Sequence, residues 1–221
     1  MLNCTWHLSK MCRKGGFITN KTTFWLSGAI IIWIALIVGG FYFLHSYNAR
    51  PGEAATAPAV WPQNEVIARA EGEQTLLIFL HPMCPCSRAT IAELEDILAA
   101  HGKNMHPIFV MMTSDKEDKE WRHSSLTRSA EAIPGGSVIQ SKSEYLEKLF
   151  SVYTSGQILL YDAAGKLVFS GGITTSRGEQ GENPGSIQLV KILSHLPAQS
   201  FVQSPVYGCP LSEAVTTKDK P

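Results

Sequence analysis

The first 52 residues contain no acidic side chain, although the 221-residue chain carries 19 acidic and 19 basic residues and a formal net charge of zero. The first acid is Glu53, so every acidic residue lies in the larger, C-terminal part of the chain. That part therefore has a mildly acidic balance, and we expect no nucleic-acid partner for it. The opposite imbalance marks residues 1–21, whose charged residues are all basic: Lys10, Arg13, Lys14 and Lys21.

Residues 24–44 lack charge altogether and form one apolar run, "FWLSGAIIIWIALIVGGFYFL". A helix needs ~20 apolar residues to cross a bilayer, whereas the apolar part of a cleaved signal peptide has only ~7–15. The following "HSYNA" also matches a small-x-small cleavage site poorly. We therefore predict an uncleaved signal anchor over residues 22–45. The positive-inside rule then places residues 1–21 in the cytoplasm and residues 46–221 outside the cytoplasmic (inner) membrane, in the periplasm.

Beyond this anchor the chain shows no internal repeat and no long low-complexity tract. Residues 46–62 are rich in Ala, Pro and Gly, without periodicity, which predicts a tether. We expect one folded domain over residues 63–211 and a polar C-terminal tail over residues 212–221.

The folded domain alternates strand and helix patterns. Apolar runs or alternation predict strands at 75–81, 106–113, 136–140, 157–162 and 166–172, the last two forming a hairpin. Helical spacing or composition predicts helices at 64–72, from the Cys-rich turn to Gly102, within 114–132, and at 142–153 and 186–196. This order predicts an α/β fold with one antiparallel addition.

The five cysteines fall on both sides of the predicted membrane. Cys4 and Cys12 belong to the cytoplasmic tail and are expected to remain thiols. Cys84, Cys86 and Cys209 face an oxidising compartment. Because three is an odd number, at least one thiol is left over, bound to a metal, or used in exchange.

Cys84 and Cys86 occur in "HPMCPCSR", where a predicted buried strand gives way to a helix. The partial positive charge of a helix N-terminus lowers a thiol pKa from ~8.5 toward ~3.5–7.5. The carboxyl ends of parallel strands are also where α/β sheets place their sites. This pattern has three interpretations: a reactive thiol, a set of metal ligands, or a pair of small buried residues.

Three segments together resemble the RedB group of membrane-anchored, extracytoplasmic thioredoxin-like proteins: "HPMCPCSRATIAEL", "TSGQILLYDAAGKLVFSGGIT" and "YGCPL". The resemblance covers roughly residues 62–211. It implies a thioredoxin-like fold, with a central mixed sheet flanked by helices, and thiol–disulfide chemistry that needs no cofactor.

The same resemblance assigns the nucleophile to Cys84 and the family's usual resolving position to Ser87. Cys86 lies between them, and a Cys84–Cys86 disulfide would close a small, strained ring. Cys209 is the alternative resolving thiol, because the chain after the last predicted helix is long enough to return to the turn. The sequence leaves Cys86 and Cys209 both open as resolving residues.

Two further segments depart from, or add to, the family pattern. Ser155 and Gly156 stand where the fold usually has a cis-proline, and a small residue there lets a partner backbone approach. Arg177 lies in a Gly-rich loop that in this fold runs near the active cysteine. A guanidinium there would stabilise a thiolate or hold a carboxylate of a bound partner. We therefore predict Ser155, Gly156 and Arg177 as substrate-binding residues.

Three functions compete for this site. The first is a thiol–disulfide oxidoreductase with Cys84, Cys86 and Cys209 as catalytic residues and a protein thiol or disulfide as partner. The second is a copper or zinc handler that uses the three cysteines, with His81 or Met83 as a further ligand, since soft thiolates select these metals. The third is a thiol peroxidase whose cysteine is oxidised to sulfenic acid and resolved by Cys209.

Overall fold

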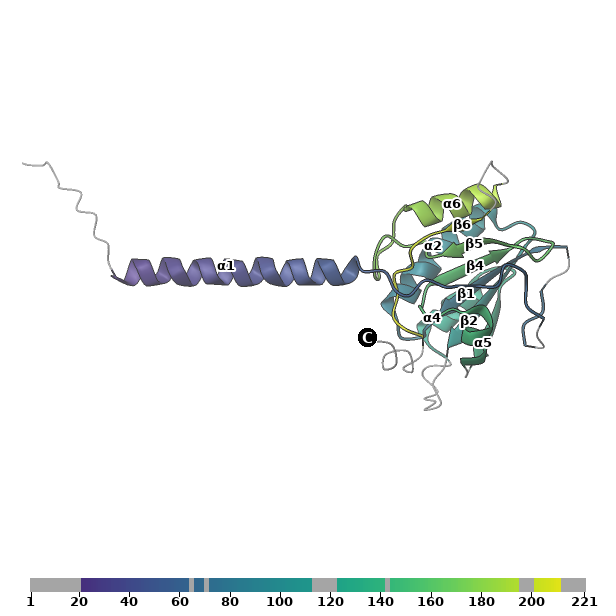
Figure 1. The fold of residues 1–221 in the computed structure, drawn as a ribbon, viewed down its shortest axis with the longest axis horizontal. Coiled ribbons are helices and arrows are strands. Elements are labelled where there is room, and N and C mark those ends of the chain that lie inside the picture. The colour runs from purple at the N-terminus through teal and green to yellow at the C-terminus, as the bar shows by residue number, and fades with distance from the viewer. Residues whose placement is uncertain are drawn as a thin grey trace, which may run out of the picture. The chain divides into compact units, whose positions relative to one another are not determined.

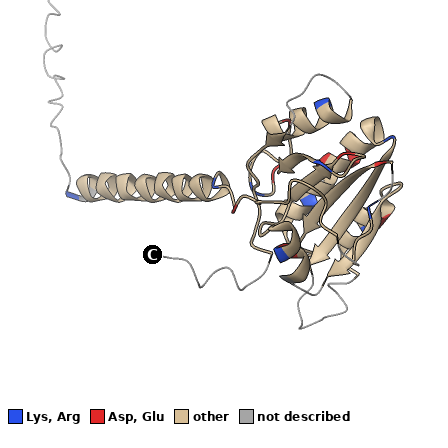
Figure 2. Cartoon of the chain, turned by 45° about the vertical axis from the view of Figure 1, so that its right-hand side comes forward, with Lys and Arg blue, Asp and Glu red and all other residues tan. Residues whose placement is uncertain are grey.

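The computed structural model describes residues 21–63, 66–69, 72–112, 123–141, 144–194 and 201–211, so Cys4 and Cys12 lie outside the described residues. The chain divides into two compact units, residues 1–45 and 46–221. In the described part, one helix is long and apolar enough to cross a membrane. It is α1 (Lys21–Asn48), whose stretch Thr23–Asn48 has a mean hydropathy of 2.2. This helix contains the predicted 24–44 run and has no charged Lys, Arg, Asp or Glu after Lys21 (Figure 2).

A six-stranded mixed sheet in the order β3-β2-β1-β4-β5-β6 organises the second unit (Figure 1). The strands β1, β2 and β3 are parallel, β4 is antiparallel to both β1 and β5, and β6 is parallel to β5. Their bounds are β1 Gln74–Leu80, β2 Met105–Met112, β3 Ser137–Ser141, β4 Gln157–Tyr161, β5 Leu167–Gly171 and β6 Val202–Gln203. The helices are α2 Pro85–His101, α4 Ser125–Ala132, α5 Glu144–Phe150 and α6 Pro184–Leu193. The five strands predicted from sequence are all present.

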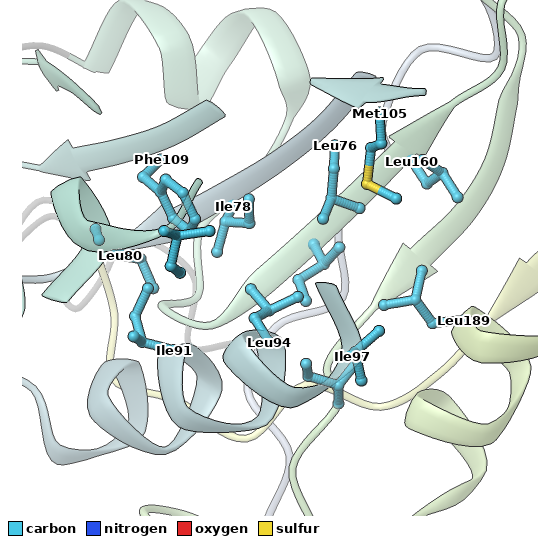
Figure 3. Packing of buried hydrophobic residues seen from close by; sticks show 14 of the residues in the cluster. Leu76, Ile78, Leu80, Ile91, Leu94, Ile97, Met105, Phe109, Leu160 and Leu189 are labelled. Atoms are coloured by element: carbon cyan, nitrogen blue, oxygen red, sulfur yellow. The ribbon is translucent and has the colours of Figure 1, made fainter. Parts of the chain in front are cut away.

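Strand β1 lies in the interior of the sheet, between β2 and β4, where apolar side chains on both of its faces are buried. Its alternate side chains point to opposite sides of the sheet. Leu76, Ile78 and Leu80 pack with residues of α2 and α6 on one side (Figure 3). Leu77 and Phe79 belong to a second cluster on the other side, which includes residues of α5. The last residue of this rigid, fully covered strand comes directly before the Cys-containing turn.

The predicted tether packs against the domain, contrary to the expectation from its composition. Gly52 N donates to Val206 O at 2.8 Å, and Trp61 N donates to Gly165 O at 2.8 Å. The Trp61 ring lies edge-on to those of Phe150 and Tyr161, with centroids 5.4 and 5.1 Å away. The segment has no periodicity of its own, but its backbone forms hydrogen bonds with the domain and its Trp61 ring packs against aromatic rings of the domain.

Three local expectations differ from the structure. Of the helix predicted at 64–72, the described residues Val66–Arg69 are not helical; Ile67 is buried and Arg69 donates to Ala163 O, so tertiary contacts override the local propensity. In 114–132, helix α4 begins only after the Ser124 cap, and 113–122 lie outside the described residues. Helix α6 starts two residues earlier than predicted, because Asn183 forms a capping box ahead of Pro184.

Candidate functional site: a cluster of three cysteines

Cys84 occupies the junction between β1 and α2. It is the N-cap residue of α2, with an extended backbone, and Pro85 follows as the first helical residue. Cys84 N donates to His81 O at 3.0 Å, and the Ser87 hydroxyl accepts the His81 N–H at 3.0 Å. These two bonds fix the turn, so the Cys84 side chain is held at the N-terminal end of the helix. The resemblance places the usual resolving residue at Ser87, and in the structure the Ser87 hydroxyl holds the turn by its hydrogen bond with His81.

Cys209 reaches the same place because the C-terminal chain returns along the sheet. Strand β6 pairs with β5, and the chain then runs antiparallel to residues 153–155. Ser155 N donates to Cys209 O at 2.9 Å, and Leu211 N donates to Tyr153 O at 2.9 Å. We call residues 205–211 the C-terminal strap. Its pairing puts a residue 125 positions away in sequence beside Cys84.

The three thiols form one compact group. The sulfur atoms of Cys84 and Cys209 are 3.4 Å apart, and the Sγ atoms of Cys84, Cys86 and Cys209 all lie within 4.8 Å of one another. A disulfide bond is ~2.05 Å long, so the 3.4 Å contact joins two free thiols and not a bonded pair. Cys84 and Cys86 are buried, with 3% and 4% of their surface exposed, and Cys209 is half-buried.

Ser155 and Gly156 lie beside the cluster. The Ser155 hydroxyl lies 3.3 Å from Cys84 Sγ and accepts the Cys209 N–H at 3.0 Å. Gly156 has φ of +84°, and its N–H donates to Phe79 O at 2.8 Å. A Cβ at position 156 would lie 2.9 Å from the Thr90 hydroxyl oxygen, so both the backbone conformation and the space favour glycine.

Arg177 is bound to the C-terminal strap. Its Nη1 donates to Gly208 O, and its guanidinium lies 5.1 Å from the centroid of the Tyr47 ring. Within the described residues, its buried Nε has no hydrogen-bond partner. The charge of Arg177 favours the ionised form of Cys209 and so acts to lower that thiol's pKa. Arg177 therefore meets the cluster through Cys209.

The hydrogen bonds of the cluster lower the pKa of one thiol and raise the pKa values of the other two. Hydrogen bonds from Cys209, Cys86 and Ser155 and the Ser87 N–H outweigh burial and hold the pKa of Cys84 far below its usual value. Hydrogen bonds with Cys209 and with Cys84, together with burial, raise the pKa of Cys86. The hydrogen bond with Cys84, together with burial, raises the pKa of Cys209, although the contact with Cys86 lowers it. These directions make Cys84 the thiol that ionises most readily.

The two other predicted ligands lie outside this group. Burial lowers the pKa of His81, although the Cys84 charge opposes the shift, and its Nδ1 accepts the Met83 N–H at 3.3 Å. The lone pair of Nδ1 is therefore engaged by the turn. Met83 is 56% exposed. In the described part of the chain, the only group with metal-ligand spacing consists of the three cysteines.

Comparison with known proteins shows which solved structures share this fold. No family model and no curated protein matches the chain. An uncharacterised conserved protein from Geobacillus kaustophilus superposes with a TM-score of 0.51 at 17% identity, over 74% of this chain and 92% of that one. A hypothetical protein from Sinorhizobium meliloti gives 0.50 at 16% identity, over 74% and 96%. Together with the sheet order, these likenesses settle the fold.

The fold is thioredoxin-like. The central mixed sheet with flanking helices was expected from the sequence and is confirmed. A secreted disulfide oxidoreductase from Mycobacterium tuberculosis matches more loosely, with a TM-score of 0.40 at 14% identity, over 57% of this chain and 84% of that one. Likeness at these identities concerns the fold alone, so the function has to be argued from the cysteine cluster.

Sequence reasoning names all three cysteines and, through the family resemblance, assigns the nucleophile to Cys84, but it does not choose between Cys86 and Cys209 as the resolving residue. It also misses the pairing of the C-terminal strap with residues 153–155. The prolines at 205 and 210 and the glycine at 208 are the available signal, since they exclude a helix and favour an extended, closely packed chain. Gly208 shows why: a Cβ there would overlap the Ser155 carbonyl oxygen.

Proposed function

We propose that this chain is a thiol–disulfide oxidoreductase in which Cys84 is the nucleophile and Cys209 the resolving residue. The observation that carries the proposal is the 3.4 Å contact between the two sulfur atoms, at the N-terminal end of α2. A thiolate is the reactive form of cysteine, and the pKa of Cys84 is strongly lowered. The partner is a protein that carries a disulfide or a dithiol.

The reaction has two exchange steps. The Cys84 thiolate attacks one sulfur of the partner disulfide, a Cys84–partner bond forms, and the other partner sulfur leaves as a thiolate that takes a proton from water. The Cys209 thiol then loses its proton to solvent and attacks Cys84 Sγ, which releases the second partner sulfur. The partner gains two electrons and two protons, the protein keeps a Cys84–Cys209 disulfide, and a second dithiol partner reduces it. The reverse sequence oxidises a dithiol.

The first step prepares the second. In the free protein the hydrogen bond to the Cys84 thiolate is the largest cause of the raised pKa of Cys209. Once Cys84 is bonded to the partner it no longer carries a charge, so this cause disappears. The Arg177 charge remains and favours the Cys209 thiolate. The resolving thiol is thus protonated until a mixed disulfide exists.

Cys86 is the weaker candidate for the resolving role. Both neighbouring thiols and its burial raise its pKa, and Arg177 is not among the groups that lower it. A Cys84–Cys86 disulfide would also need to close a short ring across the first turn of α2, which is a strained geometry. The Cys84–Cys209 bond closes a long loop through a strap that already lies beside Cys84.

Trapping distinguishes the two thiols. The full-length protein in detergent is mixed with oxidised glutathione as the probe disulfide, and adducts are read by intact-mass spectrometry. Cys209→Ser is expected to accumulate a glutathione adduct on Cys84, whereas the matched variant Cys86→Ser is expected to release glutathione as the wild type does. Trapping by Cys86→Ser alone would move the resolving role to Cys86, and no adduct in either variant or the wild type would reject the exchange mechanism.

The membrane placement is part of the same proposal. We propose that the chain is a single-pass inner-membrane protein of the RedB type, with its domain in the periplasm. The absence of Lys, Arg, Asp and Glu from α1 after Lys21, and the basic residues of segment 1–21, support this orientation. A reporter that is active only outside the cytoplasm, fused after Pro221, is expected to be active. Activity of a cytoplasm-only reporter at that position would reverse the topology and the cysteine argument that depends on it.

A second candidate function, soft-metal handling, is favoured by the compactness of the thiol group. A tetrahedral site with Zn–S bonds of ~2.3 Å has sulfur atoms ~3.8 Å apart. The three Sγ atoms, all within 4.8 Å, need only small shifts to meet this. Three thiolates fit copper(I) or zinc by donor type. Binding of one equivalent of metal by the reduced protein, lost in each cysteine variant and kept in His81→Ala, would establish this function.

A further inference from the structure

We infer that the Ser155 hydroxyl donates a hydrogen bond to the Cys84 sulfur in its thiolate form, which makes Ser155 a catalytic residue for the exchange reaction proposed above. The catalytic role of Ser155 rests on the proposed function. The hydrogen bond itself does not, because it is present in the reduced protein. The sequence suggests a substrate-binding role for Ser155.

The hydrogen-bond inventory of Ser155 fixes the direction of the contact. A serine hydroxyl has one donor and two acceptor lone pairs. The Cys209 N–H, 3.0 Å away, can only donate, so it occupies a lone pair of the Ser155 oxygen. The hydroxyl hydrogen remains, and Cys84 Sγ is 3.3 Å away. A thiolate has no hydrogen to give, so in that state Ser155 is the donor.

The surroundings of Ser155 hold it in this orientation. The residue is fully buried, so water does not compete for its hydrogen. Its own N–H donates to Cys209 O, so the backbones of the two residues are locked together. Gly208 packs against the Ser155 carbonyl, and Arg177 holds the Gly208 carbonyl. The donor is therefore oriented by the C-terminal strap, which is also the segment that carries the resolving thiol.

The other nearby hydroxyls are engaged elsewhere. Ser87 accepts the His81 N–H, and Thr90 donates to Cys86 O at 3.0 Å. Among the described residues, Ser155 is the hydroxyl group placed on Cys84 Sγ. The same donor serves both directions of exchange. It stabilises Cys84 as the attacking thiolate, and in the reverse direction it stabilises Cys84 as the leaving group when the partner's second thiol attacks the Cys84–partner mixed disulfide.

The test is the pH dependence of Cys84 alkylation in the reduced full-length protein, with each cysteine followed separately by peptide mass spectrometry. Ser155→Ala is expected to raise the alkylation midpoint of Cys84 by about one to two pH units, the size of a hydrogen bond to a charged group. Ser155→Thr keeps a hydroxyl and is expected to restore most of the shift. Ser194→Ala, which removes a hydroxyl bonded to His101 and not to the cluster, is the matched control and is expected to leave the midpoint unchanged.

A second pair of variants keeps the inference testable if Ser155→Ala does not fold. Cys209→Ala and Cys209→Pro both lack the thiol, but only the proline also lacks the N–H that orients Ser155. Cys209→Pro is expected to have the higher Cys84 midpoint. Equal midpoints in this pair, or an unshifted midpoint in folded Ser155→Ala, would overturn the role of Ser155. The proposed function would fail separately, through absence of glutathione exchange by the wild type.

Discussion

The lowered pKa of Cys84 predicts that the reduced protein gains stability as the pH rises toward the pKa of a free thiol. In the unfolded chain Cys84 titrates near ~8.5, whereas in the folded protein its hydrogen bonds keep it ionised at far lower pH. Between these two values the unfolded state binds one proton more. The free energy of unfolding therefore rises with pH, by up to about 1.4 kcal/mol per pH unit. This contribution is fully present above ~8.5 and is lost as the pH falls through the folded pKa.

The range from pH 7 to 8.5 tests the Cys84 contribution. Integrating the slope over this range gives a gain of about 1.6 kcal/mol from Cys84. The raised pKa values of Cys86 and Cys209 act with the opposite sign, because the unfolded chain loses their protons first. At pH 8.5 these two thiols together offset about 0.8 kcal/mol, so the Cys84 contribution has to be obtained by comparison with a variant. The lowered pKa of His81 acts mainly below ~6.5, the unfolded value, and so outside the range.

The assay is urea unfolding of the full-length protein in detergent, kept reduced, at pH 7 and at pH 8.5. Wild type minus Cys84→Ser gives the contribution of the Cys84 thiol. We expect this difference to increase by about 1–2 kcal/mol between the two pH values. A difference that stays constant, or falls, would show that Cys84 is not ionised in the folded protein and would refute the assignment of the cluster's negative charge to this thiol.

Three other predictions concern packing. Leu94→Ala, at a fully buried position between α2 and the sheet, is expected to lower the free energy of unfolding by about 2–5 kcal/mol, measured with urea. Gly156→Ala is expected to cost at least about 1–2 kcal/mol in the same assay, because φ is +84° and the new Cβ meets Thr90; an unchanged midpoint would contradict this. Gly208→Ala is expected to separate the strap from Ser155 and so to prolong the Cys84–glutathione adduct, seen by intact-mass spectrometry, while leaving adduct formation possible.

The sequence predicts Cys84 well because its place depends on local signals. The run Leu76–Leu80 before it is apolar at every position, as in a buried strand, and the run after it has helical spacing, so the strand, the turn and the helix follow from local pattern. The mixed sheet follows from the alternation of such elements and from the hairpin at Gly165.

The partners of Cys84 could not be predicted in the same way. Cys209 is positioned by a two-residue strand, Val202–Gln203, and by backbone bonds between the strap and residues 153–155, none of which has a periodic pattern. The contacts of segment 46–62 could not be predicted for the same reason: its composition suggests a tether, and the packing of Trp61 and the backbone of Gly52 on the domain has no local signal. Segments held by tertiary contacts alone leave little trace in local composition.

The protonation of the cluster bears on which of its two candidate functions dominates. Exchange needs a single thiolate, and the site favours one: its contacts lower the pKa of Cys84 and raise the pKa values of Cys86 and Cys209. A three-thiolate metal site needs all three ionised, so a metal has to displace two protons whose removal is opposed by the raised pKa values. Among the described residues, Arg177 is the cation that favours ionisation of Cys209, and one cation cannot balance three negative charges. Copper(I) and zinc can supply the missing charge themselves, but only in competition with protons, whereas the redox reaction starts from the protonation state that the fold already stabilises.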